Sequence, residues 1–537
     1  MNTPLLIVNA RVWSGVPLAA SAVLVRAGRV AGLGDAEALL AAAPDARVLD
    51  AAGATLTPGL TDAHVHLVPW AQARRQPDLH GAGSLEAALA RVRDALAALP
   101  PGGTPLVGRG WDESGWEQAP SRAALDVLAP LRPVVLHRHD FHALWVNSAA
   151  LLAAGVTRAT PDPEGGRFER DADGELSGIV REHAVRAFHA LEDRAGPEPS
   201  DALLDEAAAA LHAEGVTTVH DFQRNEPDAR RTAALAARHR LRVLQHVGPE
   251  QVRDAARNAR RGGEGDAWFR WGSLKLFADG TLGSRTAALL APYDDAPGTG
   301  MVLLTPVELG AEIARATAAG FSVTIHAIGD AAVRHALDAI EQHHAALAVL
   351  PLPPRIEHAQ LVHPADLARF ARLGVAASMQ PQHFTTDAPV ARRAWGSRCR
   401  NAYPWRSLLE SGASLAFGSD APVEPPLARL GLASAVARLT ADGLPLEPGE
   451  AVPLDAALAA YTSGAARLAA GHLGHGRVEV GEPADLVVWD RDLHAASSEA
   501  LAAARPRWTV LAGEIVYESG QERTHASPAS VHPEARA

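Results

Sequence analysis

The sequence has a single cysteine, Cys399, among 537 residues. No disulfide can therefore form within the chain, and a lone thiol suits a reducing compartment. Runs of about 20 apolar residues, which a membrane-spanning helix needs, are missing because Arg, Asp and Glu interrupt the alanine-rich stretches. The first eight residues, Met1 to Val8, lack the basic segment and the apolar length of a signal peptide. We therefore expect a cytoplasmic protein without membrane contact.

The sequence also lacks any block of basic residues. Its net charge is −12 at pH 7 and its isoelectric point is near 6.0, whereas surfaces that bind nucleic acid or anionic membranes are basic. A small-molecule substrate fits this composition better. A homodimer is also compatible with it. With 47% hydrophobic residues, the chain is long enough for one large domain and a smaller one.

Lysine is the scarcest of the charged residues. Of the 50 lysine and arginine residues, only Lys275 is a lysine. A guanidinium is effectively always charged, whereas a lysine amine can lose its proton when it is desolvated or crowded by cations. The solitary lysine therefore suggests chemistry on a neutral amine. The alternative interpretation is that one lysine survived by chance in an arginine-biased genome.

Short β-type runs separated by turns occur at both ends of the chain. They predict a small β-sandwich built from residues 1–57 and 470–520. Its strands are expected at Leu5 to Val8, Val23 to Arg26, Arg29 to Gly34, Arg47 to Asp50, Arg477 to Val480, Leu486 to Trp489, Trp508 to Ala512 and Ile515 to Tyr517. The polar residues 521–537 are expected to form a disordered tail.

Between these segments, apolar runs alternate with helical stretches, a pattern typical of parallel βα units. Eight such runs predict an α/β fold with a TIM-like (β/α)₈ barrel over residues 58–469. They are Gly59 to Leu67, Val216 to Phe222, Leu241 to Val247, Trp271 to Ala278, Phe321 to Ile328, Arg355 to Leu361, Val375 to Gln380 and Ser414 to Asp420. The long interval between the first two runs predicts an inserted subdomain at about residues 68–211, placed to cap the active-site face.

Side chains that can bind metals recur near the ends of these strands. In the first strand, His64 and His66 form a His-x-His pair whose spacing of two puts both rings on one side. The C-terminal ends of the strands converge if the barrel closes, so we predict that the metal-binding candidates surround one point. They are His64, His66, Lys275, His326, His358 and Asp420.

Four imidazoles, one carboxylate and one lysine fit two divalent metals. Zinc is the first choice, and Mn, Fe, Co or Ni suit the same donors. A neutral Lys275 amine can add CO₂ to give a carbamate, whose two oxygens can bridge cations about 3.5 to 4 Å apart. Two simpler interpretations stay open: single strand-end histidines can be structural, and Lys275 can be only a charge partner in a mononuclear site.

With these motifs the sequence resembles the amidohydrolase superfamily, and within it amidohydrolase family 3, over about residues 5 to 518. The resemblance is carried by residues 57–66, by Lys275 with residues 279–287, and by residues 326–330, 356–359, 418–420 and 481–487. It implies a metal-bearing barrel flanked by a β-sandwich. It also implies hydrolysis of C–N bonds in amides or cyclic amides, with relatives that look like N-substituted formamide deformylases.

For a protein of this kind we expect His64, His66, Asp420 and a carbamate on Lys275 to hold one metal. The same carbamate, with His326 and His358, would hold the other. A metal-activated hydroxide would attack the substrate carbonyl, and Asp420 would be the catalytic residue that passes a proton to the leaving nitrogen.

The sequence indicates less clearly which residues contact the substrate. Our candidates for substrate contact are Trp111, His142, Arg285 and His383, while Glu182 is either a pocket acid or a solvated helix residue. The same centre could hydrolyse esters or lactones, since hydroxide attacks either kind of carbonyl. A catalytically silent regulatory metalloprotein, an isomerase or a decarboxylase on the same barrel would also be compatible with the sequence, because a fold does not determine a function.

Overall fold

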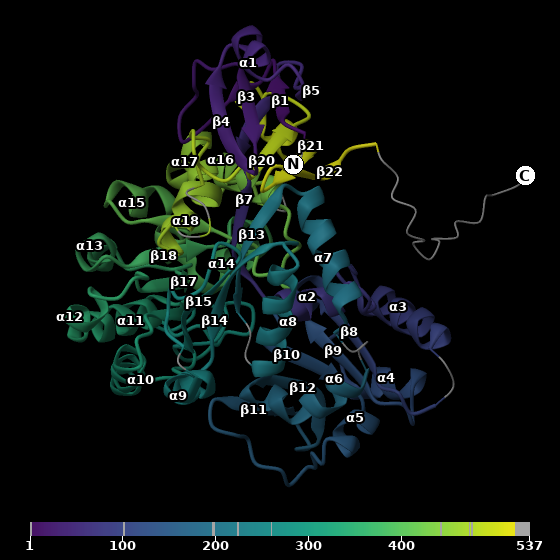
Figure 1. Cartoon of the computed structure of the whole chain (residues 1–537). Helices are drawn as coiled ribbons and strands as arrows, with labels where there is room; N and C mark the ends of the chain where they lie inside the picture. The colour runs from purple at the N-terminus through teal and green to yellow at the C-terminus, as the bar shows by residue number, and fades with distance from the viewer. Residues whose placement is uncertain are drawn as a thin grey trace, which may run out of the picture.

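The computed structural model describes residues 3–99, 102–195, 199–222, 225–258, 260–440, 443–471, 473 and 476–520. The predicted tail, residues 521–537, lies outside this part of the chain. The described residues form a central barrel, a β-sandwich beside one end of it and a separate subdomain beside the other (Figure 1). None of the described helices combines the length and the apolar character that a bilayer crossing requires.

Eight parallel strands form the central sheet, which confirms the predicted (β/α)₈ barrel. They follow one another in chain order, and adjacent strands pair in parallel. Nearly all of their residues are buried, because helices cover the outside of a barrel and side chains fill its inside. The strands are β7 (Leu60–Val65), β13 (Val216–Phe222), β14 (Arg242–Val247), β15 (Phe269–Phe277), β16 (Val323–Ala327), β17 (Arg355–His358), β18 (Ala376–Met379) and β19 (Leu415–Phe417).

The barrel closes just beyond the last residues of its first and last strands. Asp420 donates its backbone N–H to the carbonyl of His64 at 2.7 Å, and His66 donates to the carbonyl of Ala421 at 2.8 Å. Val65 and Ala421 form a parallel bridge between the same segments. Three predicted metal ligands therefore belong to the backbone seam that closes the barrel.

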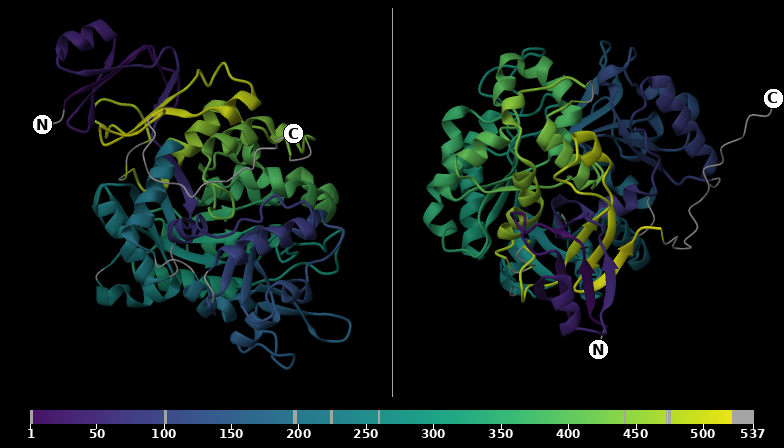
Figure 2. Two further views of the ribbon diagram at one scale, coloured as in Figure 1. Left: turned by 90° about the vertical axis from the view of Figure 1, so that its right-hand side faces the viewer. Right: turned by 90° about the horizontal axis from the view of Figure 1, so that it is seen from above.

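Helices connect the strands on the outside of the barrel (Figure 2). Their ends follow local signals. Thr305 and Glu308 form a capping box before one helix, and Gly374 ends another in a left-handed conformation at φ 64°. The helices between barrel strands are α8 (Glu226–Ala237), α9 (Pro249–Asn258), α10 (Pro306–Ala318), α11 (Asp330–Gln342), α12 (His344–Leu347), α13 (Pro364–Leu373), α14 (Pro381–Trp395), η3 (Gly396–Asn401) and α15 (Trp405–Glu410). The helices after β19 are α16 (Ala428–Ala437), η4 (Pro448–Glu450), α17 (Leu454–Ala459), η5 (Ala460–Gly464), α18 (Ala465–Leu468) and, between β20 and β21, α19 (Ser498–Ala503).

Both chain ends contribute to the β-sandwich, as predicted. One sheet has the order β4-β3-β1-β5 and the other β2-β6-β20-β21-β22, and their inward side chains share one apolar core. The elements are β1 (Leu5–Val8), β2 (Arg11–Val12), β3 (Ala22–Arg26), β4 (Arg29–Gly34), α1 (Ala36–Ala42), β5 (Arg47–Asp50), β6 (Thr55–Pro58), β20 (Leu486–Trp489), β21 (Pro506–Leu511) and β22 (Glu514–Glu518).

One predicted strand of the sandwich is wrong. Residues 477–480 form no strand, although Val478 is buried in the sandwich core. The backbone N–H of Val478 donates to the side chain of Ser14 at 2.9 Å instead of to a neighbouring strand. The β-type sequence at residues 477–480 therefore indicates a buried side chain and not a paired strand.

The predicted insertion contains its own five-stranded sheet, with the order β11-β12-β10-β9-β8. Helices α2 (Leu67–Ala73) and α7 (Asp201–Ala213), near the ends of the predicted range, contact each other, and α7 also contacts the barrel strand β13. Between them lie α3 (Leu85–Ala98), β8 (Leu106–Trp111), η1 (Glu113–Gly115), α4 (Arg122–Leu128), β9 (Val134–Arg138), β10 (Ala143–Val146), α5 (Ser148–Ala153), β11 (Gly166–Arg170), β12 (Leu176–Glu182), η2 (His183–Phe188) and α6 (His189–Ala195). We call the part from α3 to α6 the cap.

A long loop, residues 278–305, follows β15 and packs against the start of α11. The buried carboxylate of Asp279 accepts backbone N–H groups of Ala288, Ile328 and Gly329 at 2.9 to 3.0 Å. The backbone of the loop and that of the segment before α11 lie so close together that a Cβ atom on Gly329 would be 2.0 Å from the carbonyl oxygen of Ala288. Only glycine fits at this position.

We predict that Gly329→Ala destabilises the protein by about 2 kcal/mol, because the new methyl group overpacks a rigid backbone contact. Chemical denaturation followed by circular dichroism measures the change. Gly83→Ala is the matched control, since a Cβ there meets nothing within 4 Å. Equal unfolding midpoints for the two variants would contradict the prediction.

Candidate metal centre and cavity

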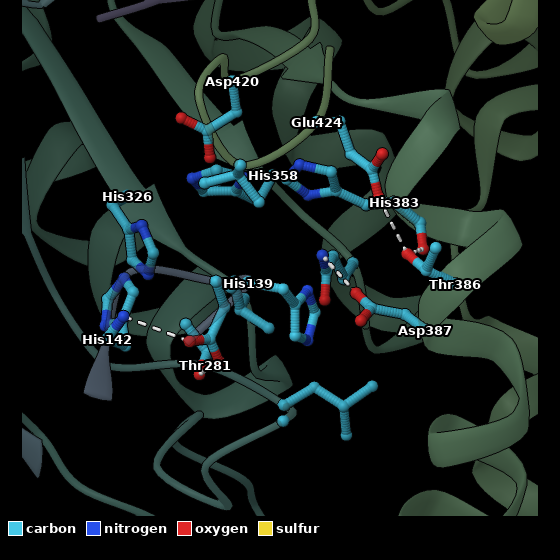
Figure 3. A pocket seen from close by; sticks show the side chains of 16 residues that line it. His139, His142, Thr281, His326, His358, His383, Thr386, Asp387, Asp420 and Glu424 are labelled. Carbon is cyan, nitrogen blue, oxygen red and sulfur yellow. Dashed lines mark hydrogen bonds between the residues drawn. The ribbon is translucent and has the colours of Figure 1, made fainter. Parts of the chain in front are cut away.

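The six predicted metal-binding residues lie at one end of the barrel. His64, Lys275, His326 and His358 are in strands, His66 caps the start of α2, and Asp420 follows β19. All are buried except His66, whose side chain is 17% exposed. Figure 3 shows His326, His358 and Asp420 around the same space.

His64, His66 and Asp420 form a compact group of metal donors, with one ligand atom of each within 4.8 Å of the others. Oδ1 of Asp420 is 3.3 Å from Nε2 of His64 and 3.4 Å from Nε2 of His66. Donor atoms that share one tetrahedral zinc ion at about 2.0 to 2.2 Å lie roughly 3.3 to 3.6 Å apart. The three side chains are therefore spaced as ligands of one ion.

In the His-x-His pair, the ring nitrogen that does not face Asp420 lies within hydrogen-bond distance of a protein oxygen. Nδ1 of His64 is 2.7 Å from a carboxylate oxygen of Glu357, and Nδ1 of His66 is 2.9 Å from the carbonyl oxygen of Phe222. Acceptors at these positions put the proton on Nδ1, so Nε2 keeps its lone pair for a metal. This arrangement is typical of metal-ligating histidines.

The other two histidines have similar support. Nδ1 of His358 is 2.8 Å from the side-chain oxygen of Gln380, and Nε2 of His326 is 3.1 Å from the carbonyl oxygen of Gly280. Their ring centroids are 4.5 Å apart, and the ring of His358 is 5.2 Å from that of His64. The four imidazoles therefore form one continuous cluster, each with one nitrogen held by an oxygen.

Lys275 lies within this cluster. Its Nζ is 3.5 Å from Nε2 of His64, and it lies 4.5 and 5.0 Å from the ring centroids of Phe222 and Phe277. A buried amine beside two aromatic rings and several imidazoles has little water to solvate a charge. The only lysine of the chain therefore lies among the predicted metal donors.

The electrostatics favour the metal-binding protonation states. Burial, with the charge of Lys275, lowers the pKa of His64 to about 4, and burial lowers the pKa of His326 and His358 well below the usual value. Burial alone would raise the pKa of Asp420, but His64 and the neighbouring imidazoles hold it well below its usual value. Neutral imidazoles and an ionised carboxylate are the forms that bind zinc.

His383 lies beside the same donors. One ligand atom each from His358, His383 and Asp420 also lie within 4.8 Å of one another. Nε2 of His383 is buried and has no hydrogen-bond partner among the described residues. His383 was predicted only as a substrate contact, and the structure places it where it could contact either a metal or a substrate.

A small cavity opens next to this cluster (Figure 3). The cap supplies one part of its wall, and the loops and helices after β15 to β19 supply the rest. Two of the four predicted substrate residues, His142 and His383, line it. The lining residues are His139, Asp140, His142, Thr281, Leu282, Gly283, His326, Ile328, His358, Gln360, His383, Thr386, Asp387, Asp420, Val423 and Glu424.

The other two predicted substrate residues lie elsewhere. Trp111 is fully buried in the core of the cap, where its indole N–H donates to the carbonyl of Leu136 at 2.8 Å. Arg285 forms an ion pair with Asp295 at 2.5 Å. The structure therefore brings neither side chain to the cavity wall.

Glu182 connects the cap to the barrel. It ends strand β12, so its interpretation as a solvated helix residue is wrong. Its carboxylate lies 2.7 Å from Nδ1 of His142 and accepts the hydroxyl of Thr286 at 2.5 Å. Its backbone has a positive φ of 52°, which is unfavourable for a residue with a side chain and often marks a functional position. His142 is thereby fixed at the edge of the cavity.

Several residues of the site escaped the sequence prediction. Glu357 precedes His358 directly, and Glu424 follows Asp420 by four residues, so both lie inside or near recognised motifs. Gln360 directly follows the motif at residues 356–359, whereas Asp387 has no such signal. An alternating strand pattern places a residue beside its neighbours in sequence, but not beside residues of another loop.

Comparisons with known proteins find relatives over most of the chain. A family described as the amidohydrolase family matches residues 47–517. The chain is 34% identical over 524 residues to YtcJ of Bacillus subtilis (strain 168), a candidate amidohydrolase, covering 93% of this chain and 96% of YtcJ. It is 31% identical over 525 residues to an N-substituted formamide deformylase of Arthrobacter pascens, with 93% and 95% covered. An uncharacterized metal-dependent hydrolase from Pyrococcus horikoshii OT3 matches with a TM-score of 0.75 and 27% identity, over 93% of this chain and 99% of that one.

We predict that Glu357→Gln weakens zinc binding by about 10- to 100-fold, because the amide orients His64 less firmly than the carboxylate does. Competition with a chromophoric chelator measures the affinity. Glu410→Gln, at an exposed position that ends α15, is the matched control. Zinc affinity equal to that of the wild type, in a variant with unchanged circular dichroism, would show that Glu357 does not support the ligand.

Proposed function

The chain belongs to the amidohydrolase family and is a metal-dependent hydrolase of C–N bonds other than peptide bonds, and we propose that its substrates are N-formyl compounds and other small amides. The observation that carries this is the joint arrangement of the donors. Four imidazoles, three of them buried, each have one nitrogen held by an oxygen, and they cluster beside Asp420 next to a small cavity. The similarity to a formamide deformylase supports the choice of substrate.

We propose two divalent metals at this centre, zinc first. His64, His66, Asp420 and a carbamate on Lys275 would hold one. The same carbamate would hold the other, together with His326 and His358. The donor spacing and the neutral imidazoles fit such ions. Bound metals would polarise the substrate carbonyl and bring the pKa of water close to neutrality.

The protein's own residues then manage the protons and the position of the substrate. Water adds to the amide carbonyl, the C–N bond breaks, and a carboxylic acid and an amine are formed. Asp420 lies at the cavity wall with an ionised carboxylate, so it can take the proton from the attacking water and pass it to the leaving nitrogen. His139, Asp140 and His142 of the cap form one part of the cavity wall and leave less of it open to bulk water.

A panel of N-formyl, N-acetyl and ester substrates of the same amine or alcohol tests this function. We expect turnover of the N-formyl compounds, and we expect Asp420→Asn to lower kcat by roughly 10²- to 10⁴-fold because the proton carrier is lost. Elemental analysis must accompany each assay, so that loss of metal is not mistaken for loss of proton transfer. Turnover of esters alone would favour an esterase, and no turnover of any substrate would favour a regulatory metalloprotein.

Replacement of the only lysine tests the metal bridge. We expect two metals per wild-type chain after purification with zinc and bicarbonate, and at most one in Lys275→Arg, because a guanidinium forms no carbamate under these conditions. Elemental analysis gives the stoichiometry, and a high-resolution map shows whether the Lys275 amine is carboxylated. Two metals in Lys275→Arg, or a bare amine in the wild type, would contradict the bridging role.

A further inference from the structure

Two carboxylates in the cavity wall are held by neutral groups. Asp387, on α14, accepts hydrogen bonds from the hydroxyl of Tyr403 at 2.8 Å and from the amide of Gln360 at 3.2 Å. Glu424 accepts one from the hydroxyl of Thr386 at 3.1 Å (Figure 3). All three donors are neutral, and neither carboxylate forms an ion pair with an arginine within the part of the chain that the structure describes.

The other two carboxylates of the cavity are different. Asp140 is 2.7 Å from the guanidinium of Arg138, and Asp420 belongs to the metal centre. Glu424 and Asp387 belong to neither of the two metal-donor groups found among the described residues. The cavity therefore has an acidic side, which we call the Glu424 wall and define as Gln360, His383, Asp387 and Glu424.

Burial of Glu424 without an arginine partner is costly. Its residue is only 6% exposed, and burial raises the pKa of its carboxyl group, although His139 and His80 oppose the rise. An ionised carboxylate inside a protein is normally paired with a charge or bound to a metal. Because the described residues place no arginine here and only these two histidines can offset a negative charge, a positively charged ligand would stabilise the carboxylate.

A second observation points to a ligand at the same wall. The side-chain oxygen of Gln360 is buried and has no hydrogen-bond partner among the described residues, and the residue is 2% exposed. The orientation of this amide is settled, since its nitrogen donates to Asp387. Nε2 of His383 is also buried without a partner among the described residues. Such atoms are usually satisfied by a ligand or by ordered water.

The free groups of the Glu424 wall are mainly acceptors: two carboxylates and one amide oxygen. They match a group that carries a positive charge and several N–H donors. We propose that this wall binds a protonated nitrogen of the substrate, so that the preferred substrates are small amides with a second, basic nitrogen away from the scissile bond. The inference rests on the proposed function for its reaction, but not for the binding of the cation.

A pair of matched substrates tests the preference. N-formyl-1,4-diaminobutane carries a terminal ammonium group, and N-formylpentylamine has a methyl group in its place. We expect the wild-type, zinc-loaded enzyme to favour the ammonium compound by roughly 10- to 100-fold in kcat/KM, the range for hydrogen bonds to a charged group. Equal values, or a preference for the neutral compound, would overturn the proposal without any variant.

The Glu424→Gln variant shows which residue produces the preference. It keeps the size of the side chain and removes the charge, so we expect the ratio of the two kcat/KM values to fall by about tenfold or more. Glu410→Gln removes an exposed carboxylate instead and should keep the wild-type ratio. An unchanged ratio in Glu424→Gln would assign the preference to another part of the cavity and contradict the role of this wall.

Binding without turnover separates this inference from the proposed function. Calorimetry of the zinc-loaded protein with n-butylammonium and with 1-butanol needs no hydrolysis. Tighter binding of the ammonium ion, weakened in Glu424→Gln, together with no hydrolysis of any amide, would retain the cation site and refute the amide substrate. Hydrolysis of N-formyl compounds with no preference for the ammonium ion would refute the cation site alone. Neither binding nor hydrolysis would refute both.

Discussion

The seam between β7 and the segment after β19 is the constraint on which the rest of the structure depends. Two backbone hydrogen bonds cross it, from Asp420 to His64 and from His66 to Ala421. They close the barrel and at the same time hold three metal-donor side chains at one place. Fold closure and metal binding are therefore coupled, because a distortion of this seam changes the ligand spacing directly.

Below the centre, a buried charge pair supports the ligands from inside the barrel. Arg355 contacts Glu357 at 2.7 Å and also lies 3.0 Å from His220 and 2.8 Å from His246. Burial would raise the pKa of Glu357, but Arg355 and His64 hold it well below its usual value. Glu357 thus stays ionised and fixes one tautomer of His64. A buried arginine deep in the barrel is in this way connected to the metal centre.

Above the centre, the cap and the barrel loops divide the cavity into regions of different chemistry. His142 stands near His326, with ring centroids 5.5 Å apart, and Glu182 and Thr286 hold it. The Glu424 wall carries the acceptors. A substrate with its carbonyl at the metals and a donor group toward the acceptors would meet both regions. The same barrel could therefore serve different substrates through changes in the cap and loops alone.

The sequence by itself determined the order of the barrel strands, the sandwich made from both ends, and the residue types at the strand ends, because apolar periodicity and metal-ligand spacing are local properties. Periodicity misplaced Val478, which is buried without a strand. Only the tertiary structure decided that Trp111 fills the cap core, that Glu182 supports His142, and that Gln360 joins the Glu424 wall. Trp111 and Glu182 meet their partners only when the sheet of the cap forms, and Gln360 meets Asp387 only when the segments after neighbouring barrel strands pack together.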